Sequence, residues 1–214
     1  DELIEKGQVL VNGVRAKLGD KVQETDTVEV RFRAPKTYTY LAYYKPIGMD
    51  THKEDTGTKD VIGSLPADLK RMKLFPVGRL DKASRGLILL TNDGRITDRL
   101  LNPKHEHEKV YEVTTKKPLR ESAKEKLEGG VDIEGYLTKP ARVTVLGEKR
   151  FRIALTEGKT HQVRRMTVAL FNEVADLKRV SIMNIRLGAL KPGTFRRIEG
   201  KELAEFLSAL DLSR

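Results

Sequence analysis

Residues 78–94 read GRLDKASRGLILLTNDG, a polar loop bounded by glycines that runs into the aliphatic segment 87–90. Four consecutive large aliphatic side chains must be buried, so the loop is anchored to a rigid strand. A fold that anchors a polar loop in this way holds a reactive side chain with little freedom. Asp81 lies in this loop between Arg79 and Lys82, whose positive charges favour its ionised form. We therefore interpret Asp81 as a nucleophile or a base, with a salt-bridged loop aspartate as the structural alternative.

The hydrophobic pattern around this loop mixes strands with helices and contains no internal repeat. Strands grouped with helices between them predict an α+β domain with a central antiparallel or mixed sheet, rather than a series of βαβ units. The predicted strands are 38–44, 74–77, 86–91, 109–115, 141–146, 150–155 and 182–187. The predicted helices are 96–101, 120–128, 161–171 and 201–210.

The first 35 residues have the pattern of a separate small module. Apolar residues alternate in GQVLVNG (7–13) and then reach Asn12-Gly13, the dipeptide most typical of a two-residue hairpin turn. Alternation returns over 28–32, which predicts another strand with one buried face. Thirty-odd residues make a thin core, so this segment is interpreted as the rear half of a module, and the polar, proline-containing stretch 34–37 as a linker. The first residue is Asp1 rather than methionine, as expected of a fragment or a renumbered chain.

The charge balance favours a polyanionic partner. Lys and Arg total 41 against 31 Asp and Glu, which gives a net charge of +10. Such an excess favours fast, salt-sensitive association with nucleic acid, although many soluble proteins are basic without binding it. No apolar run approaches the roughly 18 residues of a membrane span, and no basic-then-apolar leader opens the chain. We expect a cytoplasmic protein that does not associate with a membrane.

The sequence offers little support for a metal or a cofactor. Cysteine is absent, which excludes disulfides and thiolate ligands. Of the four histidines, His105 and His107 share a loop-like stretch, whereas His52 and His161 are distant in sequence. With these ligand counts a structural metal is not expected, and no phosphate-binding glycine loop is present.

The stretch 78–94 resembles the signature of the pseudouridine synthases of the RsuA family, G-R-L-D-x-x-[TS]-x-G-L-L-L-L-T-N-D-G. The resemblance runs through the whole signature, with Asp81 at the aspartate position and Ser84 where threonine is commoner. HEKVYEV (107–113) resembles the family's lysine-x-tyrosine strand, which places Tyr111 in the active site. EGKTHQVRRM (157–166) resembles its third motif, which places Arg164 opposite the aspartate.

The N-terminal segment resembles another known unit. GQVLVNG and the following GDKVQETDTVEV resemble the last half of the αL RNA-binding module found in a small-subunit ribosomal protein and in several RNA-modifying enzymes. The resemblance implies two domains, a truncated αL module over residues 1–35 and a catalytic domain with the pseudouridine synthase fold over 36–214. In the module we expect Arg15 and Lys17 to contact RNA.

The residues of the two further motifs support these roles on physical grounds. Lys109 and Tyr111 share one face of a strand, and a tyrosine there offers a ring for stacking a base and a phenol for proton transfer. Ordinary core packing is the alternative. Arg164 and Arg165 project about 100° apart on a helix, so one can pair with a carboxylate while the other faces RNA phosphate. Two surface arginines on a basic helix are the alternative.

The reaction that the resemblance implies is isomerisation of uridine to pseudouridine in ribosomal RNA. The N-glycosidic bond breaks, the uracil turns and it rejoins the sugar through C5, without a metal, nucleotide or redox cofactor. Asp81 would attack the ribose C1′ or the base C6, or assist glycal formation. The base must first leave its stack, which requires an aromatic platform and a grip on the RNA backbone. The residues expected to form this grip are Arg79, Lys82, Lys109, Gln162 and Arg165.

Two other functions fit the sequence. One is a pseudouridine synthase that acts on transfer RNA, and the other is a non-catalytic RNA-binding protein with the same fold. The joint presence of Asp81, Tyr111 and Arg164 argues against the second. The target uridine and its ribosomal subunit are left open, because LTKPA (137–141) resembles small-subunit members and SIMNIRLGALKPG (181–193) large-subunit members. A monomer is expected.

Overall fold

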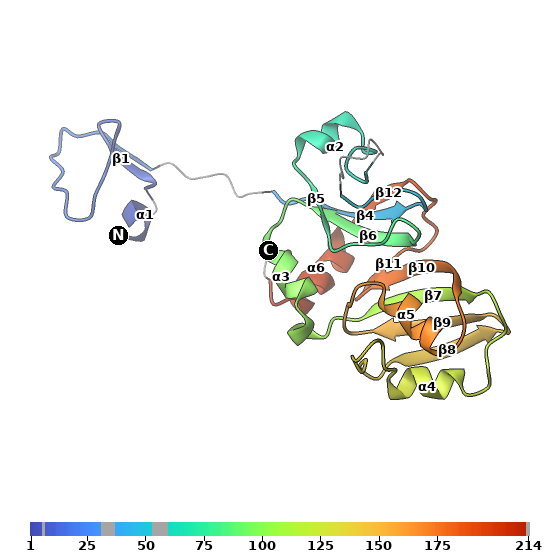
Figure 1. Cartoon of the computed structure of the whole chain (residues 1–214). Helices are drawn as coiled ribbons and strands as arrows, with labels where there is room; N and C mark the ends of the chain where they lie inside the picture. Colours follow the sequence, from blue (N-terminus) through green and yellow to red (C-terminus); the bar gives the residue numbers. More distant parts are fainter. Residues whose placement is uncertain (6, 31–36, 53–59, 213–214) are drawn as a thin grey trace. The chain divides into compact units, whose positions relative to one another are not determined.

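The computed structural model describes residues 1–5, 7–30, 37–52 and 60–212 of the chain (Figure 1). The chain forms two compact units, Asp1–Thr37 and Tyr38–Arg214. Part of the predicted second strand of the module, 31–32, and most of the predicted linker, 34–36, lie outside the described residues. None of the helices in the described ranges is long and apolar enough to cross a membrane.

The first unit is a three-stranded antiparallel sheet in the order β2-β1-β3. Its elements are α1 (Glu2–Glu5), β1 (Val9–Val11), β2 (Val14–Arg15) and β3 (Val28–Val30). The hairpin predicted at Asn12-Gly13 is present, and both residues have positive φ values, 51° and 81°, as its two-residue turn requires. The Asn12 side chain also links this turn to the residues just before β3, because it accepts from Thr27 N at 2.9 Å and donates to Asp26 Oδ1 at 2.8 Å.

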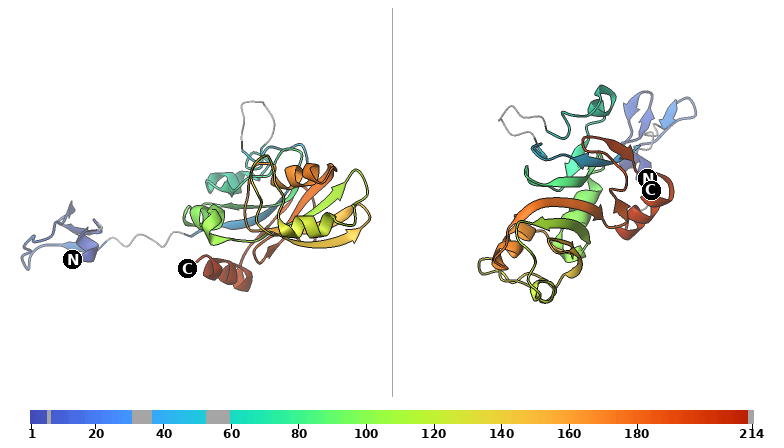
Figure 2. Two further views of the ribbon diagram at one scale, coloured as in Figure 1. Left: turned by 60° about the horizontal axis from the view of Figure 1, so that its bottom comes forward. Right: turned by 90° about the vertical axis from the view of Figure 1, so that its right-hand side faces the viewer.

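The second unit is built on a mixed sheet with the strand order β12-β4-β6-β10-β7-β9-β8, in which β5 pairs with β6 and β11 with β10 (Figures 1 and 2). Its strands are β4 (Tyr40–Lys45), β5 (Phe75–Val77), β6 (Arg85–Thr91), β7 (Lys109–Thr115), β8 (Arg142–Gly147), β9 (Arg150–Leu155), β10 (Val174–Ile182), β11 (Ile185–Arg186) and β12 (Phe195–Arg197). Its helices are α2 (Ala67–Arg71), α3 (Arg95–Leu101), η1 (Pro103–His105), α4 (Ala123–Gly129), α5 (Gln162–Ala169) and α6 (Gly200–Ala209). The predicted α+β class with a mixed sheet and flanking helices is confirmed.

The aliphatic run of β6 lies in the middle of one half of this sheet and is buried on both faces. Leu87 and Leu89 pack in a cluster with side chains of α3 and α6, whereas Ile88 and Leu90 pack on the other face with Leu69 of α2. Burial on both faces explains why four successive positions are aliphatic instead of alternating with polar residues. A separate cluster in the other half places α4 and α5 against β7, β8, β9 and β10.

The polar end of the stretch 78–94 is part of the core. Asp93 is fully buried, where it accepts a 2.6 Å hydrogen bond from the Tyr40 hydroxyl and pairs with Arg95 at 2.9 Å. Asn92 accepts from Thr39 N at 2.9 Å. These contacts fix the far end of β6 and leave the loop before β6 as the part available for chemistry.

One predicted strand is wrong in its position. The sequence predicts a strand at 182–187, but the chain forms the long strand β10 up to Ile182, turns at Met183-Asn184 and returns as the two-residue β11. Charged residues on both faces of β10, among them Lys178 and the buried Arg179, break the apolar alternation that marks a strand. The short elements α2 and β12 were not predicted either.

Gly86 allows β6 and β10 to lie unusually close. It is the Cα partner of Arg179 in the parallel pairing of these strands. A Cβ at this position would lie 2.3 Å from Arg179 O and 2.6 Å from Arg179 N, and the glycine φ is +113°. A side chain of any size is therefore excluded where the loop containing Asp81 joins the sheet.

Candidate active site

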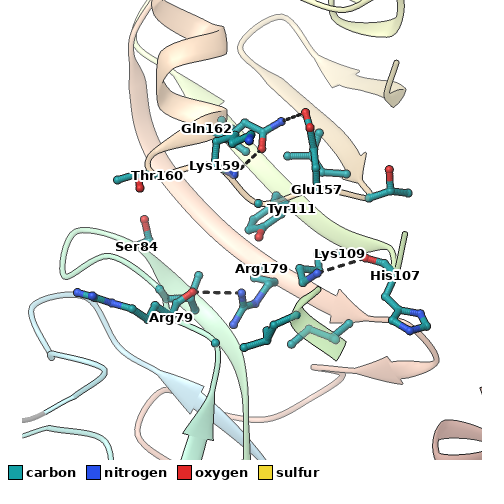
Figure 3. Close-up of a pocket in the computed structure, with 18 of the residues that line it drawn as sticks. Arg79, Ser84, His107, Lys109, Tyr111, Glu157, Lys159, Thr160, Gln162 and Arg179 are labelled. Carbon is teal, nitrogen blue, oxygen red and sulfur yellow. Dashed lines mark hydrogen bonds between the residues drawn. The ribbon is translucent and has the colours of Figure 1, made fainter. Parts of the chain in front are cut away.

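A cleft of about 440 Å³ opens in the second unit between the loop before β6, strands β7 and β10, and the loop before α5 (Figure 3). Apolar side chains form much of its wall: Val77, Leu80, Leu155, Val163 and Leu177. Asp81, Lys109, Tyr111 and Arg179 also line it. Apolar side chains and many polar ones line the cleft together, so it can bind a small polar ligand through convergent hydrogen bonds.

The loop carrying Asp81 is held from the segment that follows β4. The Thr51 hydroxyl donates to Leu80 O at 2.7 Å and accepts from Leu80 N at 3.1 Å. Gly48 N donates to Lys82 O at 2.8 Å. These bonds fix the backbone on either side of Asp81, while its own side chain remains 35% exposed and open to a ligand.

Two basic side chains at the start of α5 face the two carboxylate oxygens of Asp81. His161 Nε2 lies 3.4 Å from Oδ1, and Arg164 Nε lies 3.9 Å from Oδ2. Arg164 also donates from Nη2 to Ala83 O at 3.0 Å and to Ser84 Oγ at 3.1 Å, so it holds the loop as well as facing the carboxylate. The sequence did not single out His161. Its place within the stretch 157–166, three residues before Arg164, is the signal that could have found it, since His161 precedes α5 with a left-handed backbone and so does not lie on a helix face.

Strand β7 presents Lys109 and Tyr111 to the cleft. Both are half-buried, and the Tyr111 ring packs against the core of its half of the sheet. Lys109 Nζ donates to His107 O at 3.3 Å. Burial, and then the nearby charge of Arg179, lower the pKa of Lys109 to about 8.

Arg179 lies almost fully buried beneath the cleft, with 3% of its surface exposed. Its Nε donates to Leu87 O at 2.7 Å and its Nη1 to Arg79 O at 3.4 Å, so one guanidinium bridges the two ends of the loop that carries Asp81. Its Nη2 is buried without a hydrogen-bond partner in the described part of the chain. The sequence did not predict a role for Arg179, since no pattern marks a buried cation on a strand.

A second buried cation, Lys45, ends β4 close to the same loop. Its Nζ donates to Met49 O at 2.7 Å and to Pro46 O at 3.0 Å, and the residue is fully buried. Burial lowers the pKa of Lys45 to about 8, although the charges of Asp50 and Asp81 act in the opposite direction.

Gln162 belongs to a buried hydrogen-bond network that shapes the loop before α5. Its Nε2 donates to Glu157 Oε1 at 2.6 Å, and its Oε1 accepts from Lys159 N at 2.9 Å. Glu157 also accepts from the Tyr136 hydroxyl at 2.5 Å and from Lys139 N at 3.0 Å. Because both ends of the Gln162 amide are engaged, its observed contacts are with the loop, and its expected contact with RNA stays a prediction.

The other residues predicted to grip RNA lie in different surroundings. Arg79 is exposed at the cleft (Figure 3), and Lys82 Nζ lies 3.2 Å from Asp50 Oδ2. Arg165 donates to Ile133 O and to Glu134 Oε2, both at 2.7 Å. The two predicted contacts of the first unit, both exposed, are Arg15 and Lys17.

Within the described ranges, no group of three His, Asp or Glu residues could hold a metal ion. The His105 and His107 rings stack on each other, with their centroids 5.9 Å apart.

Comparison with known proteins identifies the chain as an RNA pseudouridine synthase, an isomerase that acts on RNA. Residues 39–169 match the family model of RNA pseudouridylate synthase, and residues 1–28 match that of the S4 domain. The chain belongs to this family, in the group that includes RsuA and RluF, and carries an N-terminal S4 RNA-binding domain. The resemblance seen in the sequence is thereby confirmed, including that of the N-terminal module.

Similar proteins cover nearly the whole chain. It is 37% identical over 218 residues to the dual-specificity RNA pseudouridine synthase RluF of Escherichia coli K12, covering 100% of this chain and 74% of that protein. It is 35% identical over 209 residues to the ribosomal small subunit pseudouridine synthase A of Vibrio cholerae, covering 95% and 90%. A crystal structure of a pseudouridylate synthase superposes with a TM-score of 0.73 at 28% identity, covering 98% of this chain and 91% of that one.

Proposed function

We propose that this enzyme isomerises a uridine of ribosomal RNA and that Asp81 is its catalytic carboxylate. The observation that carries the proposal is the position of Asp81 at the cleft, on a loop held by Thr51, Gly48 and Arg164. An exposed carboxylate on a fixed backbone can meet a flipped-out nucleotide without reorganising the protein. Attack on C1′ or on C6, or assistance to glycal formation, each requires an ionised carboxylate at this point.

Two further side chains have proposed roles around Asp81. Tyr111 offers its ring to the uracil, and its hydroxyl can move the proton that leaves C5. Arg164 keeps the loop in place through Ala83 and Ser84 and presents a permanent positive charge to the carboxylate. Tyr111 lies on β7 and Arg164 on α5, which packs against that half of the sheet, whereas Asp81 precedes β6 in the other half.

Ribosomal RNA is the proposed substrate class because of the S4 domain and of the relative whose name specifies the ribosomal small subunit. Transfer RNA is the second candidate, since another relative is named a dual-specificity enzyme. Pseudouridine mapping in ribosomal and transfer RNA from cells with and without the gene separates them. Loss of a ribosomal pseudouridine supports the proposal, and loss confined to transfer RNA contradicts it.

The role of Asp81 is tested by Asp81→Asn, which removes the charge and the nucleophile but almost no volume. We expect tritium release from RNA containing 5-tritiated uridine to fall by at least about a thousandfold, since the amide that replaces the carboxylate can act neither as the nucleophile nor as the general base. Asp68→Asn, at an exposed position in the first turn of α2, is the matched control and should keep the full rate. Turnover of Asp81→Asn within about tenfold of the parent would exclude a covalent or general-base role.

A further inference from the structure

Three hydrogen-bond donors meet on the floor of the cleft without acceptors to match them. Arg179 Nη2 is buried and has no partner among the described residues. Lys109 Nζ has one acceptor, His107 O, at 3.3 Å, although an ammonium has three hydrogens to donate. The Tyr111 hydroxyl forms no hydrogen bond within the described part of the chain. Of these three donors, Arg179 Nη2 is the one buried from solvent, where a donor without an acceptor is costly. The half-buried Lys109 and Tyr111 have donor capacity that a ligand in the cleft could fill.

The strand register brings these donors together. Arg179 of β10 and Tyr111 of β7 are Cα partners in an antiparallel pair, which places their side chains on one face about 5 Å apart at Cβ. Lys109 lies two residues from Tyr111 and so projects from the same face of β7. All three line the same cleft (Figure 3), and the charge of Arg179 is felt at Lys109.

The two carboxylates that line the cleft are engaged by groups outside this floor. Leu80, Leu155 and Leu177 line the cleft next to it and carry no polar side-chain atom. Of the two carboxylates in the lining, Glu157 is already bonded to Tyr136 and Gln162. Asp81 faces the basic residues of α5 instead.

We propose that Arg179 and Lys109, beside the Tyr111 ring, form a floor of donors that selects uracil over cytosine through the two carbonyl oxygens of uracil. This inference rests on the proposed function and adds the base selectivity of the same site. Uracil carries an acceptor at both C2 and C4. Cytosine carries an amino group at C4, which would place a donor against the donors of the floor.

The reaction itself explains why such a floor is useful. Turning the uracil so that C5 replaces N1 exchanges the positions of the C2 and C4 oxygens. A floor made only of donors therefore fits the base before and after the turn. A base that leaves the sugar with the electron pair of the N1–C1′ bond carries a negative charge shared by both oxygens. Lys109 and Arg179 stabilise that charge from the floor of the cleft.

The test is the preference between two RNA fragments that differ only in the base at the modified position, uridine in one and cytidine in the other. Binding is measured with the Asp81→Asn enzyme, so that no turnover intervenes. It is measured again after Lys109→Met is added to Asp81→Asn, a change that keeps the apolar stem of the lysine and removes its donors. Lys124→Met, at an exposed site on α4, is the matched loss of one charge. We expect the parent of this comparison, Asp81→Asn alone, and the Lys124→Met control to bind the uridine fragment at least about tenfold more tightly than the cytidine fragment. In Lys109→Met this ratio of affinities should fall below about threefold.

A second variant, Arg179→Lys, keeps the charge and loses the free Nη2 donors. Because Arg179 also holds the loop, the fold of this variant is checked by thermal unfolding. Should it fail to fold, Lys109→Met decides alone. A preference in Lys109→Met within twofold of the parent overturns the proposal, as does a parent without preference. Failure of the proposed function is recognised separately, since the unmutated enzyme would then release no tritium from the uridine fragment.

Discussion

The close approach of β6 and β10 leads to a strong prediction for Gly86→Ala. The new methyl group would lie 2.3 Å and 2.6 Å from backbone atoms of Arg179, which cannot rotate away, at a φ of +113°. Such a φ costs a residue other than glycine about 1–3 kcal/mol, and forcing the strands apart costs about 1–3 kcal/mol more. The sum, about 2–6 kcal/mol, is a large part of the roughly 5–15 kcal/mol that stabilises a typical domain. With a urea dependence of about 2 kcal/mol per molar, the unfolding midpoint should fall by about 1–3 M.

The measurement is urea unfolding followed by circular dichroism, beside tritium release in the absence of urea. Gly94→Ala is the matched control, because Gly94 has a φ of −63° and a Cβ added there would meet no atom within 4 Å. It should change stability by less than about 1 kcal/mol. A midpoint for Gly86→Ala within about 0.3 M of the parent would refute the argument that this glycine sets the spacing of β6 and β10.

Two more predictions concern RNA affinity and pH. Deleting residues 1–35 removes Arg15, Lys17 and Lys21, so the slope of log affinity against log salt should decrease in magnitude by about 2–3. The rate at saturating RNA should fall much less, and a deletion that keeps RNA affinity but loses the maximal rate would contradict this prediction. The pKa of Lys45 is about 8 in the folded protein, against 10.5 in an unfolded chain. Between these two pH values unfolding therefore takes up a proton, and the free energy of unfolding should rise with pH by up to about 3 kcal/mol. In Lys45→Met that part of the rise should vanish from urea midpoints measured between pH 7.5 and 10.5, and an unchanged slope would show that the lysine titrates normally.

The sequence predicted correctly the strands and the turn whose residue pattern has a single structural explanation. β7 and β9 begin and end where the sequence predicts them, at 109–115 and 150–155, and the aliphatic run of β6 indicates a strand buried on both faces. The Asn12-Gly13 turn was predictable because positive φ at both positions restricts the residue types. β10 was misplaced because Arg179 fills an inward position that the pattern reserves for apolar residues.

The candidate site was predictable only where a motif marked it. Asp81, Tyr111 and Arg164 stand out by resemblance, and the structure places Arg164 within 3.9 Å of Asp81. His161 approaches the same carboxylate because its left-handed backbone, with a φ of 53°, starts α5 at that point, and no periodicity encodes such a conformation. The engagement of Gln162 by Glu157 likewise follows from the path of the loop and not from a spacing rule.

The site depends on how the two halves of the sheet are joined. Among the paired strands of the described residues, β6 and β10 are the parallel pair, and they join β12-β4-β6 to β10-β7-β9-β8. Asp81 precedes β6, whereas Arg179 lies on β10 and Tyr111 on β7, so the carboxylate and the floor of the cleft come from different halves. Arg179 spans the junction by bonding Leu87 O and Arg79 O, and its charge also reaches Lys109. A change at this junction therefore moves the carboxylate relative to the base, even where no residue that touches the substrate is altered.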